Sequence, residues 1–108
     1  MKIDLEMEMP VLSNKIGGYS GKAIKPIGIR CVYDISQNIQ IPIIGVGGIT
    51  NGEDVIEYFM AGASAVQVGS AIYYRDLDVF NKIRDEIIIW MKDHGYENLS
   101  ELIGVAHK

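Results

Sequence analysis

Residues 41–50 read IPIIGVGGIT, an apolar run that ends in two glycines and a small polar residue. The β-branched residues that dominate positions 41–46 are typical of a strand that is buried on both faces of a parallel sheet, with helices covering each face. Gly47 and Gly48 then remove every side chain from the carboxyl end of that strand. The stretch therefore predicts a buried parallel strand, and it raises the question of what requires bare backbone at its end.

The elements on either side of this strand complete an alternating pattern. Upstream, residues 26–38 begin with a proline and carry apolar side chains at helical spacing. Downstream, Asn51 is expected to cap a helix that stops at Gly62, because asparagine suits the N-cap and glycine suits the position after the last turn. A second strand is expected over 65–69 and an amphipathic helix over 77–94. This strand–helix–strand–helix order predicts an α/β fold with a parallel sheet.

Shorter elements are expected at the two ends of the chain. Residues 2–5 and 9–12 are predicted to pair as a small hairpin, and residues 14–22 form a glycine-rich loop. Near the other end, Ser100 is expected to cap a last helix over 101–106. Within the long helix, one apolar stripe is expected to pack into the core of the complete domain and to be exposed if the rest of that domain is absent: Phe80, Ile83, Ile87, Ile88, Trp90 and Met91.

Composition excludes several classes of function. The chain has 108 residues, 48% of them apolar, and a net charge of −4, so neither nucleic acid nor an anionic membrane is an expected partner. No apolar stretch reaches the ~20 residues that span a bilayer, and residues 1–10 lack the pattern of a signal peptide. Cys31 is the only cysteine, which forbids an intrachain disulfide and makes the cytoplasm the simplest location.

Both predicted strands end in glycine and a small residue. Ligands of α/β proteins sit beyond the carboxyl ends of parallel strands, where glycine lets backbone N–H groups approach an anion. Either pair, Gly47–Gly48 or Gly69–Ser70, is also compatible with a tight turn that lets a helix pack closely on a strand. Because two such pairs follow successive strands, we favour a phosphate site that both pairs form together.

Three segments resemble a known family. They are GGYSGKAIKPIGIRCVYDIS at 17–36, IPIIGVGGITNGEDVIEYFMAGASAVQVGSAIY at 41–73 and SELIG at 100–104. Together they resemble the C-terminal part of class 1 dihydroorotate dehydrogenases, and among these the NAD-linked, two-subunit type. The glycine-rich loop followed by AIKP is the most specific part of this resemblance.

The resemblance implies that residues 1–108 are the C-terminal part of one FMN-binding (β/α)₈ barrel domain. They would supply the last two strand–helix units and the glycine-rich loop and helix before them. The implied activity is the FMN-dependent oxidation of dihydroorotate to orotate in pyrimidine synthesis. An electron-transfer subunit with FAD and an iron–sulfur cluster is the implied partner, in an oligomer.

In that family, residues matching Gly21, Gly47, Gly48, Gly69 and Ser70 contact FMN, and the last four surround its phosphate. The sequence departs from the family at Tyr19, Lys22 and Ser70, where leucine, proline and threonine are common. Serine keeps the hydroxyl of threonine, so no change in FMN affinity is expected from that departure.

By the same resemblance, the catalytic cysteine, the flavin-side lysine and the asparagines that hold orotate lie upstream. No catalytic residue is therefore expected here, and the chain, whose Met1 resembles an internal methionine, is expected to be a terminal fragment that is inactive alone. Two alternatives stay open. One is a flavoprotein similar to dihydropyrimidine dehydrogenase, and the other is a non-catalytic phosphate-binding or interaction module.

The cysteine, one lysine and the two histidines are expected to have structural and not catalytic roles. Cys31 is expected to be a small buried hydrophobic residue inside the helix, not a catalytic base. Lys25 is expected to be solvated. His94 suits the negative end of the long helix, and His107 is almost terminal. The spacing of cysteine, histidine and carboxylates matches no metal-ligand pattern, so no metal is expected.

Overall fold

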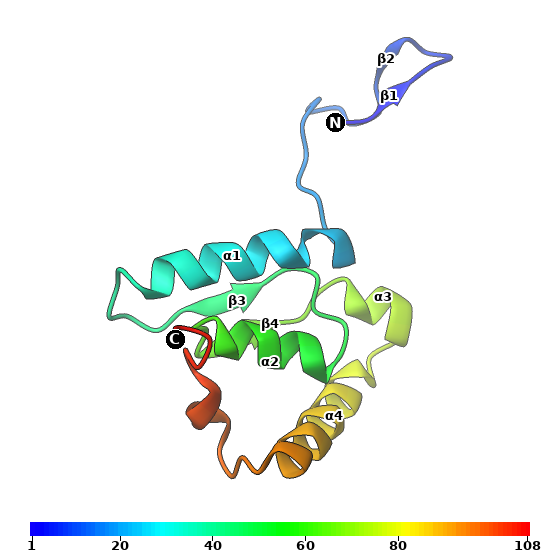
Figure 1. Cartoon of the computed structure of the whole chain (residues 1–108). Helices are drawn as coiled ribbons and strands as arrows, with labels where there is room; N and C mark the ends of the chain where they lie inside the picture. Colours follow the sequence, from blue (N-terminus) through cyan, green and yellow to red (C-terminus); the bar gives the residue numbers. More distant parts are fainter.

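The computed structural model describes all 108 residues, and its helices and strands follow the predicted order with two additions (Figure 1). The elements are β1 (Ile3–Asp4), β2 (Met9–Pro10), the 3₁₀ turn η1 (Lys22–Ile24), α1 (Lys25–Ser36), β3 (Ile44–Val46), α2 (Gly52–Met60), β4 (Ala65–Gln67), α3 (Ala71–Arg75), α4 (Val79–His94) and the 3₁₀ turn η2 (Leu99–Leu102). None of the helices is long and apolar enough to cross a membrane.

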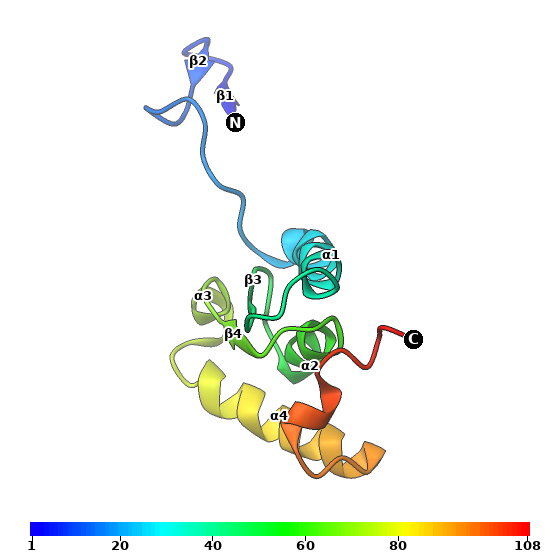
Figure 2. The ribbon, with the colours of Figure 1, turned by 90° about the vertical axis from the view of Figure 1, so that its left-hand side faces the viewer.

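The centre of the fold is a parallel pair of strands. β3 and β4 pair in the register Ile44↔Ala65 to Val46↔Gln67, with α1 and α2 packed beside them (Figures 1 and 2). α4 packs against the far side of α2. The fully buried Tyr58 of α2 lies at the middle of the core. The chain is therefore a small α/β layer, as the alternating pattern predicted.

The prediction that the first strand is buried on both faces is wrong. In β3 only Gly45 is buried, whereas Ile44 and Val46 are 55% and 54% exposed. Successive side chains of a strand point to opposite faces, and the helices of this chain cover only the face of Gly45. Two neighbouring large apolar side chains are thus left uncovered on the other face.

Local signals placed the helices well. α1 has Pro26 in its first turn, and α2 starts with the capping box formed by Asn51 and Asp54. Gly62, at φ 115°, follows the end of α2 in a backbone conformation that favours glycine. α4 ends at His94 as predicted, and Gly95 with φ 75° caps it.

Three details differ from the sequence-based prediction. The 3₁₀ turn η1 and the five-residue α3 were not predicted, because each is too short to show helical periodicity. The last element is a 3₁₀ turn capped by Asn98, not a helix capped by Ser100. Along the stripe of α4, Ile83 is buried but Phe80 is 51% exposed, so only part of that stripe packs within this chain.

The N-terminal hairpin stands apart from the rest of the molecule. β1 and β2 pair antiparallel, as predicted, with Ile3 opposite Pro10. Residues 11–20 are all exposed and connect the hairpin to η1 as an extended arm (Figures 1 and 2). The hairpin therefore adds nothing to the core that α1, α2 and α4 share.

Candidate functional site

The glycine-rich segments meet at one small cavity of about 170 Å³. It lies where the loop before α1 approaches the carboxyl ends of β3 and β4. All five residues singled out from the sequence line it: Gly21, Gly47, Gly48, Gly69 and Ser70. The remaining lining residues are Ser20, Ile24, Val46, Ile49 and Gln67. The fold thus brings together three loops that are far apart in the sequence.

Backbone donors at this cavity are free. The N–H groups of Gly48, Gly69 and Ser70 donate no hydrogen bond within the chain, and Gly47 directly follows the last paired residue of β3. The Gly47 carbonyl, which belongs to the same peptide unit as the Gly48 N–H, accepts a hydrogen bond from the Tyr58 hydroxyl at 2.8 Å. Carbonyl and N–H of a trans peptide point in opposite directions, so the Gly48 N–H points away from Tyr58. We call these four residues the glycine cradle.

Tyr58 holds its place because two other glycines make room for it. A Cβ at Gly28 of α1 would lie 2.1 Å from the Tyr58 hydroxyl oxygen, and a Cβ at Gly45 of β3 would lie 2.5 Å from its ring. Burial raises the pKa of the Tyr58 hydroxyl, which therefore stays a neutral donor. Tyr58 was not predicted as part of the site, although glycine inside a strand, as at Gly45, is a known sign of a close approach.

The glycines of the cradle are needed for different reasons. Gly48 has φ 71°, and a Cβ there would lie 2.9 Å from both Lys25 N and Gly21 O. Gly47 has φ 123°, and its Cβ would meet Ile24. Close packing against the start of α1 therefore requires glycine at both positions, with or without a bound ligand. A Cβ at Gly69 would meet no atom of the chain within 4 Å, so packing gives no reason for glycine there.

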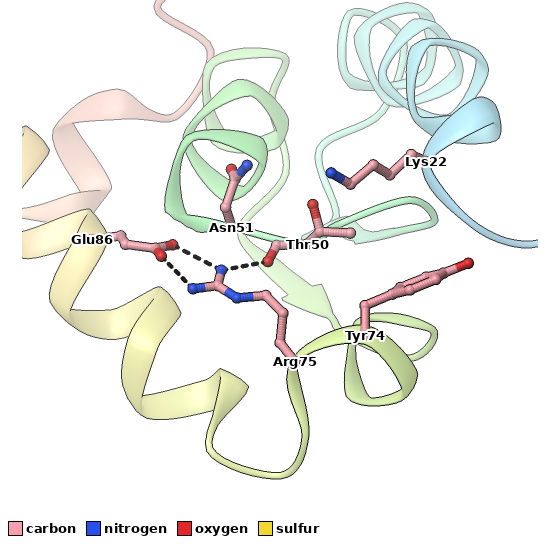
Figure 3. A pocket seen from close by; sticks show the side chains of 6 residues that line it. All are labelled: Lys22, Thr50, Asn51, Tyr74, Arg75 and Glu86. Carbon is pink, nitrogen blue, oxygen red and sulfur yellow. Dashed lines mark hydrogen bonds and ion pairs between the residues drawn. The ribbon is translucent and has the colours of Figure 1, made fainter.

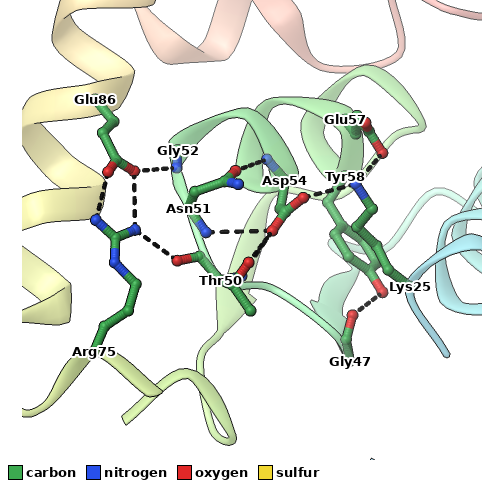
Figure 4. A network of polar contacts seen from close by, with 10 residues as sticks. All are labelled: Lys25, Gly47, Thr50, Asn51, Gly52, Asp54, Glu57, Tyr58, Arg75 and Glu86. Carbon is green, nitrogen blue, oxygen red and sulfur yellow. Dashed lines mark hydrogen bonds and ion pairs between the residues drawn. The ribbon is translucent and has the colours of Figure 1, made fainter. Parts of the chain in front are cut away.

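Lys25 is not the solvated side chain that the sequence suggested. Its Nζ donates to Asp54 Oδ1 at 2.6 Å and lies 3.0 Å from Glu57 Oε2 (Figure 4). Burial alone would lower the pKa of Lys25, but the hydrogen bonds and charges of Asp54 and Glu57 outweigh it and raise that pKa. Lys25 is therefore a structural cation that joins α1 to α2.

Asp54 organises the loop after the cradle. Its Oδ2 accepts hydrogen bonds from Thr50 N at 2.8 Å, Thr50 Oγ1 at 2.9 Å and Asn51 N at 3.2 Å (Figure 4). Burial alone would raise the pKa of Asp54, but Lys25 and the Thr50 donors lower it below the ordinary value of 3.8. Asp54 is therefore an anion that fixes the chain just beyond Gly48.

A second ion pair approaches the same loop from the other side. Arg75 Nη2 donates to Glu86 Oε1 at 2.6 Å, while Arg75 Nη1 donates to Thr50 O at 2.7 Å (Figure 4). Glu86 Oε2 also accepts from Gly52 N at 2.7 Å. The hydrogen bond from Arg75 lowers the pKa of Glu86. Burial alone would raise that pKa, and the hydrogen bond from Gly52 N–H lowers it further. No local sequence pattern indicates this pair, because Arg75 and Glu86 come from different helices.

A larger polar cavity of about 620 Å³ lies beside this ion pair (Figure 3). Its lining residues are Lys22, Thr50, Asn51, Tyr74, Arg75 and Glu86. Lys22 follows Gly21 of the glycine-rich loop and forms no ion pair.

The remaining candidates lie elsewhere. Cys31 is on α1, as predicted, but it is exposed and not buried, because Val32 and not Cys31 faces the core. His94 contacts Trp90 O through Nδ1 at the end of α4. His107 Nε2 contacts Ser36 Oγ at 2.8 Å. No group of three histidine, cysteine or carboxylate side chains is arranged to hold a metal ion.

Known proteins match this chain over most or all of its length. A sequence profile of the dihydroorotate dehydrogenase family matches residues 1–91. The chain is 56% identical over 108 residues to the catalytic subunit of dihydroorotate dehydrogenase B (NAD(+)) from Methanocaldococcus jannaschii, covering 100% of this chain and 35% of the relative. It is 48% identical over 106 residues to the same subunit from Pyrococcus abyssi, covering 98% of this chain and 36% of that relative. The chain thus spans about a third of the length of the curated relatives it matches.

Solved structures give the same result. The ligand-free dihydroorotate dehydrogenase of Eimeria tenella matches with a TM-score of 0.81 and 35% identity, over 90% of this chain and 28% of that chain. The same enzyme in complex with ferulenol matches with a TM-score of 0.81 and 32% identity, over 99% of this chain and 29% of that chain. The resemblance noted in the sequence is therefore confirmed, and the chain belongs to the dihydroorotate dehydrogenase family.

Proposed function

We propose that this chain supplies the phosphate-binding part of an FMN-dependent dihydroorotate dehydrogenase, whose complete catalytic subunit oxidises dihydroorotate to orotate in pyrimidine synthesis. One observation carries the proposal. The five residues that the family resemblance assigns to FMN line a single cavity, and three of them, Gly48, Gly69 and Ser70, offer backbone N–H groups with no partner in the chain. The chemistry of these donors suits an anion.

The residues of the cavity fit a phosphate better than they fit a neutral ligand. Gly48, Gly69 and Ser70 can direct N–H groups at phosphate oxygens, and the Ser70 hydroxyl is a further donor. No carboxylate lines the cavity. Bound FMN supplies the two-electron acceptor for the oxidation. The role of this chain is to bind and orient the phosphate end and to exclude water from it.

We further propose that β3 and β4 are the last two strands of a (β/α)₈ barrel. The uncovered side chains of Ile44 and Val46 support this arrangement, because barrel interiors are filled by branched apolar side chains of neighbouring strands. The electron acceptor would be an FAD- and iron–sulfur-containing subunit, as the NAD(+) type of the relatives suggests. The free, exposed thiol of Cys31 suits the reducing cytoplasm.

The test uses a complete subunit, in which this chain replaces the matching segment of the 56% identical Methanocaldococcus jannaschii relative. After reconstitution with FMN, anaerobic addition of dihydroorotate is expected to bleach the flavin absorbance and to form one orotate per flavin. Cys31→Ser serves as the control and should bleach at the same rate. A subunit that binds FMN but is not reduced by dihydroorotate would contradict the proposed activity.

A further inference from the structure

The glycine cradle consists of two halves that lie one to three positions beyond the last paired residues of the sheet. The paired register of β3 and β4 ends at Val46 and Gln67, whereas the cradle residues lie beyond it. Gly47–Gly48 and Gly69–Ser70 are loop residues on separate chain segments. A phosphate held by both halves requires them at a fixed separation, and a contact between the two loops beyond the sheet would fix that separation further.

Arg75 makes that contact. It is the last residue of α3, the short helix that begins immediately after Ser70. Its Nη1 donates to the carbonyl oxygen of Thr50 at 2.7 Å, and Thr50 lies two positions after Gly48. Helix α3, which follows Ser70, and the hydrogen bond from Arg75 to Thr50 O therefore join the two halves. Arg75 does not line the cradle cavity itself.

Glu86 makes this joint rigid. Both its oxygens contact the guanidinium, at 2.6 Å and 3.3 Å, and Oε2 also accepts from Gly52 N. A Cβ at Gly52 would lie 2.7 Å from Glu86 Cβ, so α4 lies directly against the start of α2. The planar guanidinium can donate to the Glu86 carboxylate and to the Thr50 carbonyl at the same time. A lysine ammonium on a flexible stem is less suited to hold both acceptors in this geometry.

We infer that Arg75, oriented by Glu86, is a positioning residue that sets the separation of the two halves of the glycine cradle. The inference rests on the proposed function, because it assigns Arg75 to the binding of the FMN phosphate. It predicts a selective effect. Loss of Arg75 should weaken the binding of a flavin that carries a phosphate, and leave the binding of the same flavin without a phosphate unchanged.

The experiment compares FMN with riboflavin, which lacks the phosphate. Dissociation constants are measured by quenching of flavin fluorescence in the complete subunit, for the wild type, Arg75→Met and Arg75→Lys. Arg84→Met is the matched control, because Arg84 pairs only with Asp85 on the exposed face of α4. Thermal midpoints of the flavin-free proteins are recorded in parallel.

Arg75→Met is expected to lower the ratio of FMN to riboflavin affinity about tenfold, the effect of losing one charge-assisted hydrogen bond. Arg75→Lys should recover part of the ratio, and Arg84→Met should keep it. An unchanged ratio in Arg75→Met, or equal losses for both flavins, overturns the inference. If Arg75→Met does not fold, Glu86→Gln carries the test, with a fall of about threefold expected and an unchanged ratio overturning the inference. A wild type that binds both flavins equally would instead contradict the proposed function.

Discussion

Lys25 Nζ lies 2.6 Å from Asp54 Oδ1, and this ion pair joins the first turn of α1 to the first turn of α2. The other oxygen of Asp54 accepts from Thr50. Thr50 is therefore fixed from two sides, through its N–H and hydroxyl by Asp54 and through its carbonyl by Arg75. The loop that follows Gly48 is held by contacts among four separate helices.

Asp54→Asn is predicted to destabilise the complete subunit by about 3 kcal/mol, because an amide cannot replace a carboxylate that accepts from Lys25 and Thr50 in a buried site. The matched control is Glu57→Gln, since Glu57 is the exposed second partner of Lys25 and should cost less than about 1 kcal/mol. Urea unfolding followed by far-UV circular dichroism measures both. Equal, small effects would show that the buried pair is not structural.

Acid is predicted to weaken the same loop. The folded-state pKa of Asp54 lies below its ordinary 3.8 and that of Glu86 below its ordinary 4.5. The unfolded chain therefore binds more protons than the folded chain in acid. The stability from these two carboxylates is complete above about pH 5 and is lost as the pH falls through the lowered folded-state values.

The thermal midpoint of the complete subunit, measured from about pH 7 down to about pH 3, should therefore fall at the acid end. The double variant Asp54→Asn, Glu86→Gln should start lower and fall less steeply. Lys25 affects stability at the alkaline end, because its pKa is raised in the folded chain. Its contribution to stability is complete below the ordinary pKa of 10.5 and is lost as the pH rises through the folded-state pKa. A double variant with the wild-type acid slope would refute this assignment.

Two glycine substitutions separate packing from binding. Gly48→Ala is predicted to lower stability by about 2 kcal/mol, because alanine at φ 71° is strained and its Cβ would meet Lys25 and Gly21. Gly69→Ala meets no atom of the chain, so its thermal midpoint should stay within about 2 °C of the wild type. Its FMN affinity should nevertheless fall at least about tenfold if the backbone there contacts phosphate.

Thermal melts and FMN titrations of the two variants give the answer together. A Gly69→Ala protein with wild-type FMN affinity would leave only the tight-turn interpretation for Gly69–Ser70. A Gly48→Ala protein with wild-type stability would show that the close approach of α1 to the cradle is not tight.

The 108-residue chain alone is predicted to associate. Ile44 and Val46 are exposed on the uncovered face of β3, and a two-stranded sheet leaves both outer edges unpaired. Analytical ultracentrifugation with flavin absorbance recorded across the boundary should show oligomers without stoichiometric FMN. A sharp monomer boundary that carries one FMN per chain would support the small-module alternative instead.

Short-range signals made most of the fold predictable. The Asn51–Asp54 capping box, Pro26 in the first turn of α1 and Gly62 after α2 all lie within a few residues of the boundaries they set. The exposure of Ile44 was not predictable in this way. An apolar run indicates that a strand is suited to burial, but it does not show which surfaces within the same chain are present to bury it.

The candidate site was predictable in part for the same reason. Glycines at strand ends carry a local signal, and all of the predicted ones line one cavity. Lys25 pairs with Asp54 from another helix, and Arg75 pairs with Glu86 from another helix. Such partners meet only after folding. The exposure of Cys31 was mispredicted from residue type alone, since the face of α1 that packs is set by Val32.

A crystal structure of the complete subunit with FMN bound places the phosphate directly. We expect its oxygens within about 3 Å of the backbone nitrogens of Gly48, Gly69 and Ser70, with Thr50 O still bonded to Arg75. A phosphate held by other segments, with these N–H groups facing water or protein, would contradict the glycine cradle and the function proposed from it.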